Sequence, residues 1–193
     1  LLDVTFTAAT TLLTLAALVL VTRWLAQGLG PERFGAYSLA RRIASALTAF
    51  SPVGLALTRF LAMDNSPERR AGYLLSGTAS VVAPSLFLAL LGLGFGAYWT
   101  DVVFRDSIYR SLWNATVLLV LGLHVYALLY AWYRGTGQMR VANLWQLAVV
   151  ALGPMLIAVL YSRSGKPDLV IDLQGLLLCA AGLPLTVWVA RAL

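Results

Sequence analysis

Two arginines, Arg41 and Arg59, flank an apolar stretch that is long enough to cross much of a membrane as a helix. The 18 residues from 41 to 59 equal five α-helical turns, so in one continuous helix both side chains share a face, about 27 Å apart. Ser45 and Thr48 fall between them on that face. Because a guanidinium group binds phosphate oxygens in pairs, the stripe predicts binding of an anionic group inside a membrane cavity.

Arg42 is the third arginine of this segment and lies about 100° around the helix from Arg41. We assign it to the same candidate substrate-binding site as Arg41, Arg59, Ser45 and Thr48. A second interpretation stays open, because a long arginine side chain near a helix end can extend to the lipid headgroups instead of lining a cavity.

His124 lies well inside a charge-free stretch at residues 111–133. A neutral imidazole that hydrogen-bonds a neighbouring helix is the preferred interpretation. The alternative is proton coupling, because ionisable groups within membrane spans often serve transport and imidazole titrates near neutral pH.

Asn143 and Gln146 bring two amide groups into the charge-free stretch at residues 141–162. Inside a helix bundle such groups form hydrogen bonds between helices. We therefore interpret them first as interhelical contacts and second as cavity lining.

No feature of the sequence indicates an enzyme. It contains no Walker A motif, no H-E-x-x-H or G-x-S-x-G motif, and no cluster of histidine or cysteine. The single cysteine, Cys179, forms no intramolecular disulfide and no cysteine-based metal site. We therefore expect no catalytic residue, no metal site and no cofactor.

The elements that position these residues follow from the distribution of charge. The 193 residues include only 14 basic and 8 acidic side chains, and 60% of the residues are hydrophobic. The charges leave six uncharged stretches of 16 to 30 residues, and a spanning helix needs about 20 apolar residues. The sequence therefore predicts an all-α membrane protein with six transmembrane helices, at about 4–26, 35–62, 71–99, 111–133, 141–162 and 169–190.

This pattern leaves no room for a folded domain outside the membrane, so residues 1–193 are expected to form one six-helix transmembrane lobe. It excludes a soluble enzyme, a disulfide scaffold and a disordered tail. The net charge of +6 indicates no nucleic-acid partner, because basic residues in short loops are ordinary topology signals. The chain begins with Leu1 and stops just after a predicted span, so we expect a piece of a longer protein.

Three segments carry a resemblance to a known family. Residues 29–38 (LGPERFGAYS) resemble the turn after the first span of Wzx-type polysaccharide and O-antigen flippases, members of the multidrug/oligosaccharidyl-lipid/polysaccharide (MATE-like) exporter superfamily. Residues 51–61 (SPVGLALTRFL) are similar to the end of that family's second span. Residues 133–143 (YRGTGQMRVAN) are similar to its short link between spans four and five.

The resemblance implies one lobe of a two-lobe transporter in the cytoplasmic (inner) membrane. It implies flipping of a lipid-linked oligosaccharide by alternating access, for export of cell-surface polysaccharide. The implied partners are membrane lipid, an anionic oligosaccharide carried on a polyprenyl pyrophosphate, and a second six-helix lobe in the same chain or in another copy. Arg59 lies within a matched segment, whereas Arg41 and Arg42 lie just past one.

Two other functions remain as alternatives. Length and span count also fit the six-helix substrate-capture subunit of a vitamin transporter, although the first span lacks alanines spaced four residues apart. A membrane glycosyltransferase or polymerase is the other alternative, and it is disfavoured because the longest connecting loop, near residues 99–110, is short.

Overall fold

The computed structural model describes residues 2–49, 53–64 and 66–182, with side chains described from Thr5 onward. Within these residues the regular elements are helices, and no strand occurs. This confirms the all-α class. The helices are α1 (Leu2–Leu29), α2 (Pro31–Ala49), α3 (Val53–Met63), α4 (Pro67–Gly94), α5 (Gly96–Phe104), η1 (Ser107–Tyr109), α6 (Arg110–Gly135), α7 (Met139–Gln146), η2 (Leu147–Leu152), α8 (Gly153–Tyr161), η3 (Ser162–Ser164) and α9 (Pro167–Ala181).

Four helical stretches are long and apolar enough to cross a membrane, and α2 with α3 makes a fifth if this bent pair is one span. The four stretches are Thr5–Leu29, Pro67–Gly94, Ser107–Gly135 and Met139–Ser164. These helices indicate a multi-pass membrane protein. The described part of the predicted sixth span, α9, has 15 residues, and residues 183–190 lie outside the described part. Six spans therefore remain a prediction.

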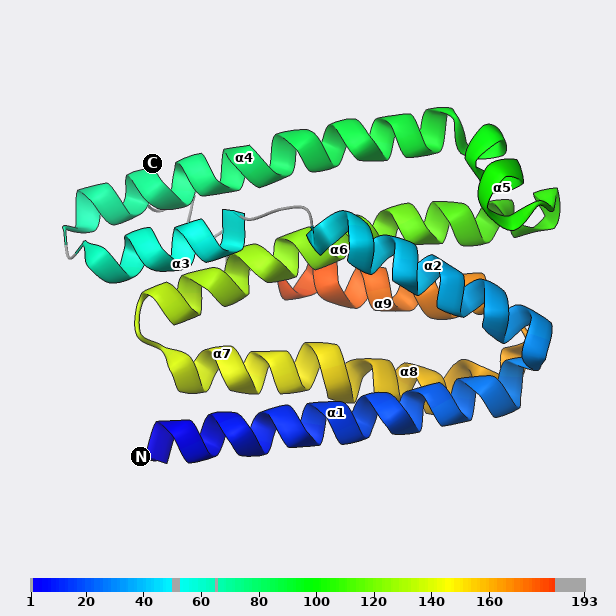
Figure 1. Ribbon diagram of the computed structural model, residues 1–193, viewed down its shortest axis with the longest axis horizontal. Helices are drawn as coiled ribbons and strands as arrows, with labels where there is room; N and C mark the ends of the chain where they lie inside the picture. The colour runs from blue at the N-terminus through cyan, green and yellow to red at the C-terminus, as the bar shows by residue number, and fades with distance from the viewer. Residues whose placement is uncertain (1, 50–52, 65, 183–193) are drawn as a thin grey trace.

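The link between α1 and α2 is tighter than the sequence suggested. Only Gly30 separates the two helices, and its φ of 78° is a left-handed conformation that glycine adopts without strain. Pro31 then begins α2, where its fixed φ suits the first helical turn and its missing N–H costs nothing. This glycine–proline pair reverses the chain and brings α2 back across the bundle (Figure 1).

The third predicted span, about 71–99, is corrected in its boundaries. α4 covers Pro67–Gly94 and continues through Pro84. The helix ends at Gly94, and Phe95 follows as its C-cap. Phe95 stands between Gly94 and Gly96, and glycine favours a helix less than any other residue except proline. Much of the connection that was predicted as a loop near residues 99–110 is helical, as α5 and η1.

The turn between α3 and α4 is organised by Asp64. Its carboxylate accepts a hydrogen bond from the Ser66 backbone N–H at 2.9 Å and lies 3.5 Å from the Arg69 guanidinium. The backbone hydrogen bond, followed by the attraction of Arg69, lowers the pKa of Asp64. Ser66 in turn caps the first turn of α4.

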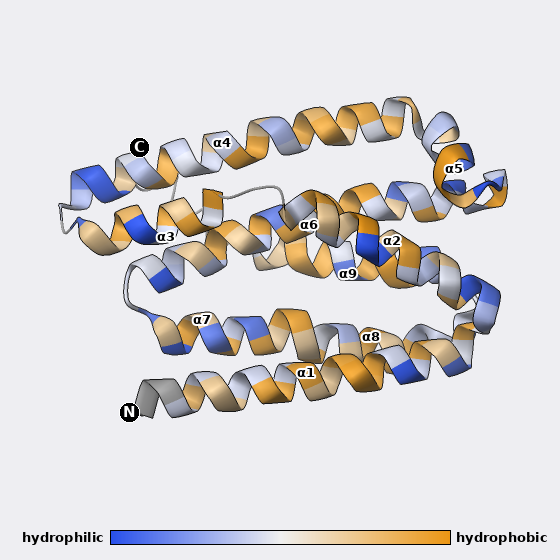
Figure 2. Cartoon of the chain, viewed as in Figure 1, coloured by the Kyte–Doolittle hydropathy of each residue, from blue (hydrophilic) through white to orange (hydrophobic). Residues whose placement is uncertain are grey.

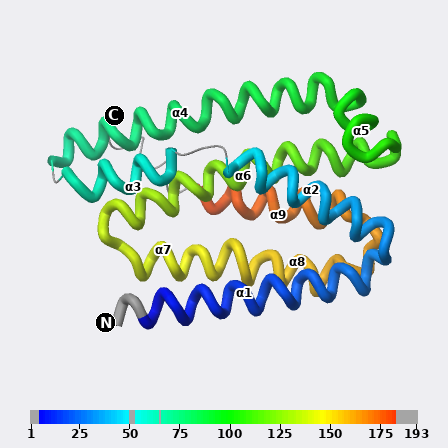
Figure 3. The backbone as a smooth tube through the Cα atoms, in the orientation of Figure 1, coloured from blue at the N-terminus to red at the C-terminus, as the bar shows by residue number. Residues whose placement is uncertain are grey.

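The central helix of the fold is α6. It packs against α2, α3, α4, α5, α7 and α9, and Figures 1 and 3 show it running through the middle of the bundle. In the most apolar 18 residues of the candidate span that contains α6, 61% of the residues are buried. The corresponding share is 22% in each of the other three candidate spans. Most residues in those stretches of the other three candidate spans are therefore at least partly exposed.

The outward surfaces are apolar, as a membrane requires. Figure 2 shows hydrophobic residues over much of α1 and over the second half of α4. Leu12 on α1 is 68% exposed and Leu90 on α4 is 71% exposed. Contact of such exposed leucine side chains with water is unfavourable, whereas their contact with the hydrocarbon chains of lipids is favourable.

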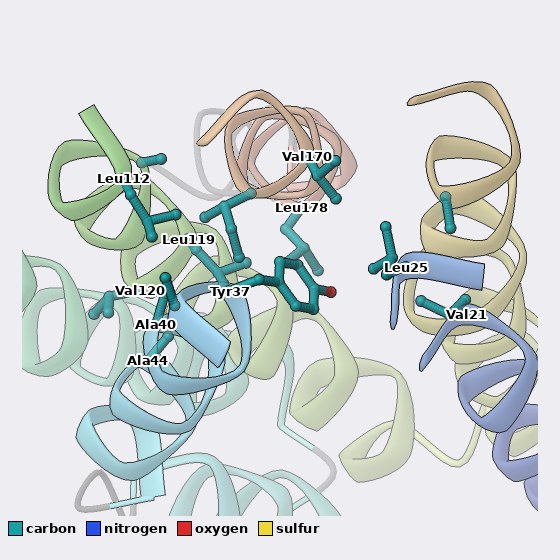
Figure 4. Close-up of a cluster of buried hydrophobic side chains, with 14 of the residues drawn as sticks. Val21, Leu25, Tyr37, Ala40, Ala44, Leu112, Leu119, Val120, Val170 and Leu178 are labelled. Carbon is teal, nitrogen blue, oxygen red and sulfur yellow. The ribbon is translucent and has the colours of Figure 1, made fainter. Parts of the chain in front are cut away.

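The largest buried cluster joins α1, α2, α6, α8 and α9 (Figure 4). On α2 its members include Ala40 and Ala44, neither of which is exposed at all. Because these side chains are small, the backbone of α2 can approach its neighbours closely. Figure 4 shows the Tyr37 ring projecting from α2 toward Leu178 of α9.

Glycines bring α6 and α9 together. A Cβ atom built on Gly122 of α6 would lie 2.8 Å from the carbonyl oxygen of Gly175 on α9, and one on Gly175 would lie 3.0 Å from the Leu119 nitrogen on α6. Two helices that meet backbone to backbone in this way gain van der Waals contact that larger side chains would prevent.

Candidate functional site

Arg41 is half-buried and is held by a residue from the far end of the sequence. Its Nη1 donates a hydrogen bond to Oε1 of Gln174 on α9 at 2.5 Å. Gln174 is only 1% exposed, and its Nε2 donates to the Tyr37 hydroxyl at 3.3 Å. These three residues, named here the Arg41 network, connect α2 with α9.

The Arg41 network follows from the packing of α2. Tyr37 and Arg41 are one helical turn apart, so both can reach α9 from the same side of α2. Ala40 and Ala44 belong to the buried cluster that α2 shares with α6 and α9. Close contact of the alanine face thereby places the two longer side chains beside Gln174.

Most N–H donors of Arg41 have no partner among the residues that the structure describes. A guanidinium has five N–H donors, and within the described residues Arg41 makes one hydrogen bond. Arg41 lies about 15 Å along α2 from Pro31, at ten residues and 1.5 Å per residue. The other end of α2, Ala49, is eight residues away, or about 12 Å. An arginine inside a membrane helix is costly unless its guanidinium binds an anion or water or extends to the headgroups.

Ser45 and Thr48 share the face of α2 that carries Arg41, and Arg42 lies about 100° around the same helix. Arg42 and Ser45 are exposed. Thr48 is half-buried, and its hydroxyl donates to the Ala44 and Ser45 carbonyls of its own helix, each at 3.0 Å. Four of the five predicted substrate-site residues therefore share one region of α2.

Arg59, the fifth predicted residue, is not on a continuous helix with Arg41. α2 and α3 are separate helices whose axes differ by 44°, and residues 50–52, with Pro52, lie outside the described residues. Arg59 is exposed on α3, which packs against α4 and α6, whereas α2 packs against α6 and α9. The single straight helix assumed from the sequence is therefore not found, and the 27 Å separation no longer applies.

His124 is buried on α6 and bonds within its own helix. Its Nδ1 lies 3.0 Å from the Val120 carbonyl oxygen, which makes Nδ1 the protonated nitrogen, because a carbonyl only accepts. The hydrogen-bond partner of His124 is therefore in α6 itself and not, as the preferred interpretation expected, in a neighbouring helix. The charge of the imidazole stays a prediction. Proton coupling stays a prediction.

Asn143 joins two helices, as its first interpretation predicts. Its side chain is 2% exposed, and Nδ2 donates to the Thr7 hydroxyl of α1 at 2.7 Å. Gln146, one turn later, is half-buried at the end of α7, where the chain passes into the π-helical segment η2. Lining of a cavity by either amide stays a prediction.

Replacing Asn143 by leucine is expected to lower the unfolding free energy in detergent by about 1 kcal/mol, the usual size of a hydrogen bond between membrane helices. Substrate binding should not change, because Asn143 contacts α1 and not the Arg41 network. Thermal unfolding of the purified protein measures the first effect. A loss of binding with unchanged stability would instead place Asn143 in the cavity.

Gln174 and Tyr37 were not predicted as site residues. The signal for Gln174 was present, since it is an amide inside the charge-free stretch 173–190, like Asn143 and Gln146 in theirs. Tyr37 belongs to the segment at residues 29–38 that carries the family resemblance.

The described residues contain no group of three or more histidine, cysteine, aspartate or glutamate side chains that could hold a metal ion. The chemistry of the Arg41 network is therefore that of hydrogen-bond donors and positive charge. No family model, no curated protein and no solved structure matches this chain.

Proposed function

We propose that this protein is one lobe of a flippase that moves an anionic lipid-linked oligosaccharide across the cytoplasmic membrane. The observation that carries the proposal is Arg41, a cation well within α2 that Gln174 positions and that makes one of its five possible hydrogen bonds within the described residues. A pyrophosphate group presents the oxygens that such donors bind in pairs.

In this mechanism the α2 arginines hold the headgroup while the lipid tail stays in the bilayer. Gln174 restricts the rotation of Arg41, so less side-chain entropy is lost when the phosphate binds. Arg42 and Ser45, exposed beside it, add a second cation and a hydroxyl. Because a desolvated guanidinium–phosphate pair is strong, the opposite conformation must weaken it to release the cargo.

Alternating access needs a second body against which this lobe can move. A second six-helix lobe, in the same polypeptide or from another copy, provides it under this proposal. The sequence resemblance also supports the proposal, because its first segment forms the turn between α1 and α2 and contributes Tyr37 to the Arg41 network.

The proposal is tested in cells of the source organism. Loss of the gene should abolish surface polysaccharide and leave the lipid-linked oligosaccharide on the cytoplasmic face of the membrane. The full-length wild-type gene should restore export, whereas a double variant, R41Q with R59Q, should not, at equal protein level. Normal surface polymer with the double variant would overturn the assignment.

A further inference from the structure

A cavity of about 310 Å³ opens between α2, α4, α5 and α6. It lies on another side of α2 from the Arg41 network, because Ile43 and Leu47 line it whereas Arg41 bonds to α9. Nothing in the proposed transport cycle uses it.

The walls of this cavity are hydrocarbon. Leu88, Leu91, Val103 and Val117 line it together with two tryptophans, Trp99 and Trp113. It is therefore a site for an apolar group, and liquid water does not occupy a space of this kind stably.

The buried polar groups of the wall are already hydrogen-bonded. The Ser85 hydroxyl donates to the Val81 carbonyl at 2.6 Å, and the Thr116 hydroxyl donates to the Leu112 carbonyl at 2.7 Å. The Trp113 indole N–H donates to the Gly92 carbonyl at 2.8 Å. These groups leave no unmet donor to attract a polar ligand.

The cavity lies beside an apolar, outward-facing surface of α4, which a bilayer would cover. Along α4 it extends from Ser85 to Gly92, about 10 Å at 1.5 Å per residue. The neighbouring outward residue Leu90 is 71% exposed, so hydrocarbon chains of the bilayer run next to the opening. An unfilled space would leave its walls without contact atoms, and an adjacent acyl chain supplies them.

A cation, Arg110, lies near Trp113, which is one of the residues that line the cavity. A Cβ atom built on Gly96 would lie 3.6 Å from Nη2 of Arg110 and 3.6 Å from Cδ1 of Trp113, so the guanidinium lies over this glycine beside the indole. The Trp113 ring stacks on Trp99 with centroids 6.1 Å apart. Paired tryptophans next to a cation are typical of the level of lipid headgroups.

We infer that this cavity binds one acyl chain of an anionic phospholipid from the surrounding bilayer, with the lipid phosphate at Arg110. The hydrocarbon walls accept the chain and the guanidinium pairs with the phosphate, so one molecule satisfies both features. The site is separate from the transport site, and it does not depend on the proposed function.

The test measures lipid binding to the full chain, purified in detergent and freed of lipid, by native mass spectrometry. Phosphatidylglycerol should occupy one site about tenfold more tightly than phosphatidylcholine with the same chains. A89L fills the cavity and L88F narrows it, and each should lower the affinity for both lipids at least tenfold. L90F, on the outward face of the same helix, is the control and should leave both affinities unchanged.

The charge is tested separately from the cavity. R110Q should reduce phosphatidylglycerol binding to the level of phosphatidylcholine, whereas R23Q, which removes an exposed arginine from α1, should not. Because Leu88 is partly exposed, L88F gives an answer even if A89L does not fold. Equal affinity for the two lipids, or unchanged binding in both cavity variants, would overturn the inference. Displacement of phosphatidylglycerol by an equimolar polyprenyl phosphate would also overturn it, and would assign the cavity to the transported lipid.

Discussion

Replacing Arg41 by alanine is expected to lower the affinity of the purified protein for a polyprenyl pyrophosphate about 100-fold, because two charge-assisted hydrogen bonds to the headgroup are lost. Replacement by lysine keeps the positive charge but loses the planar guanidinium group, so the affinity of Arg41→Lys should be about a tenth of the wild-type affinity. Binding of a fluorescent polyprenyl pyrophosphate in nanodiscs measures both effects.

Substitutions of Gln174 test whether the Arg41 network binds phosphate or only supports the fold. Gln174→Glu retains the shape of the side chain and the contact with Arg41, but it introduces a carboxylate that competes with the phosphate for the guanidinium. We expect a loss of affinity close to that of Arg41→Ala, with little change in thermal stability. Gln174→Leu removes the hydrogen-bond acceptor without adding charge, and it should lower the affinity for the polyprenyl pyrophosphate only about tenfold.

Arg23→Ala is the matched control for Arg41, since it removes an exposed arginine from α1. Arg59→Ala should weaken binding less than Arg41→Ala, because Arg59 is exposed on a different helix. If Arg41→Ala binds like the wild type while Arg59→Ala does not, the site lies on α3 and the Arg41 network is structural.

Replacing Gly122 by leucine should prevent α6 and α9 from packing and leave little folded protein in detergent. The reason is steric, because even one added carbon would lie 2.8 Å from the Gly175 carbonyl oxygen and 2.8 Å from Leu178 Cβ. The smaller change Gly122→Ala should lower the unfolding free energy by about 1–3 kcal/mol. Thermal unfolding and size-exclusion chromatography measure the two outcomes.

Gly72→Ala is the control for the intrinsic effect of removing a glycine from a helix. A Cβ atom there would meet nothing within 4 Å, so the variant should be neutral or more stable by up to about 1 kcal/mol. If Gly122→Ala were as stable as Gly72→Ala, the close approach of α6 and α9 would not contribute to the fold.

The helical class followed from the sequence because it depends on local composition. Charge-free stretches at residues 4–22, 111–133 and 141–162 lie within helical segments of the structure. Gly30 and Pro31 likewise mark the end of α1 and the beginning of α2 through their own backbone preferences.

The arrangement of the site did not follow from the sequence, because it depends on contacts between distant segments. Arg41 and Gln174 are 133 positions apart, and helical periodicity in α2 says nothing about which helix lies beside it. The break between α2 and α3 also removed the continuous stripe on which Arg41 and Arg59 were paired. A period of 3.6 residues relates two side chains only while the helix axis stays straight.

The central place of α6 has a consequence for how the protein is made. The helices α2, α3 and α4 are synthesised before α6, yet each of them packs against it, and α1 packs against α7 and α8, which follow later still. The early helices therefore enter the bilayer before their main partners have left the ribosome, and lipid must cover their contact faces meanwhile. A nascent chain released before residue 110 holds no central helix, and it offers those uncovered faces to membrane quality-control proteases.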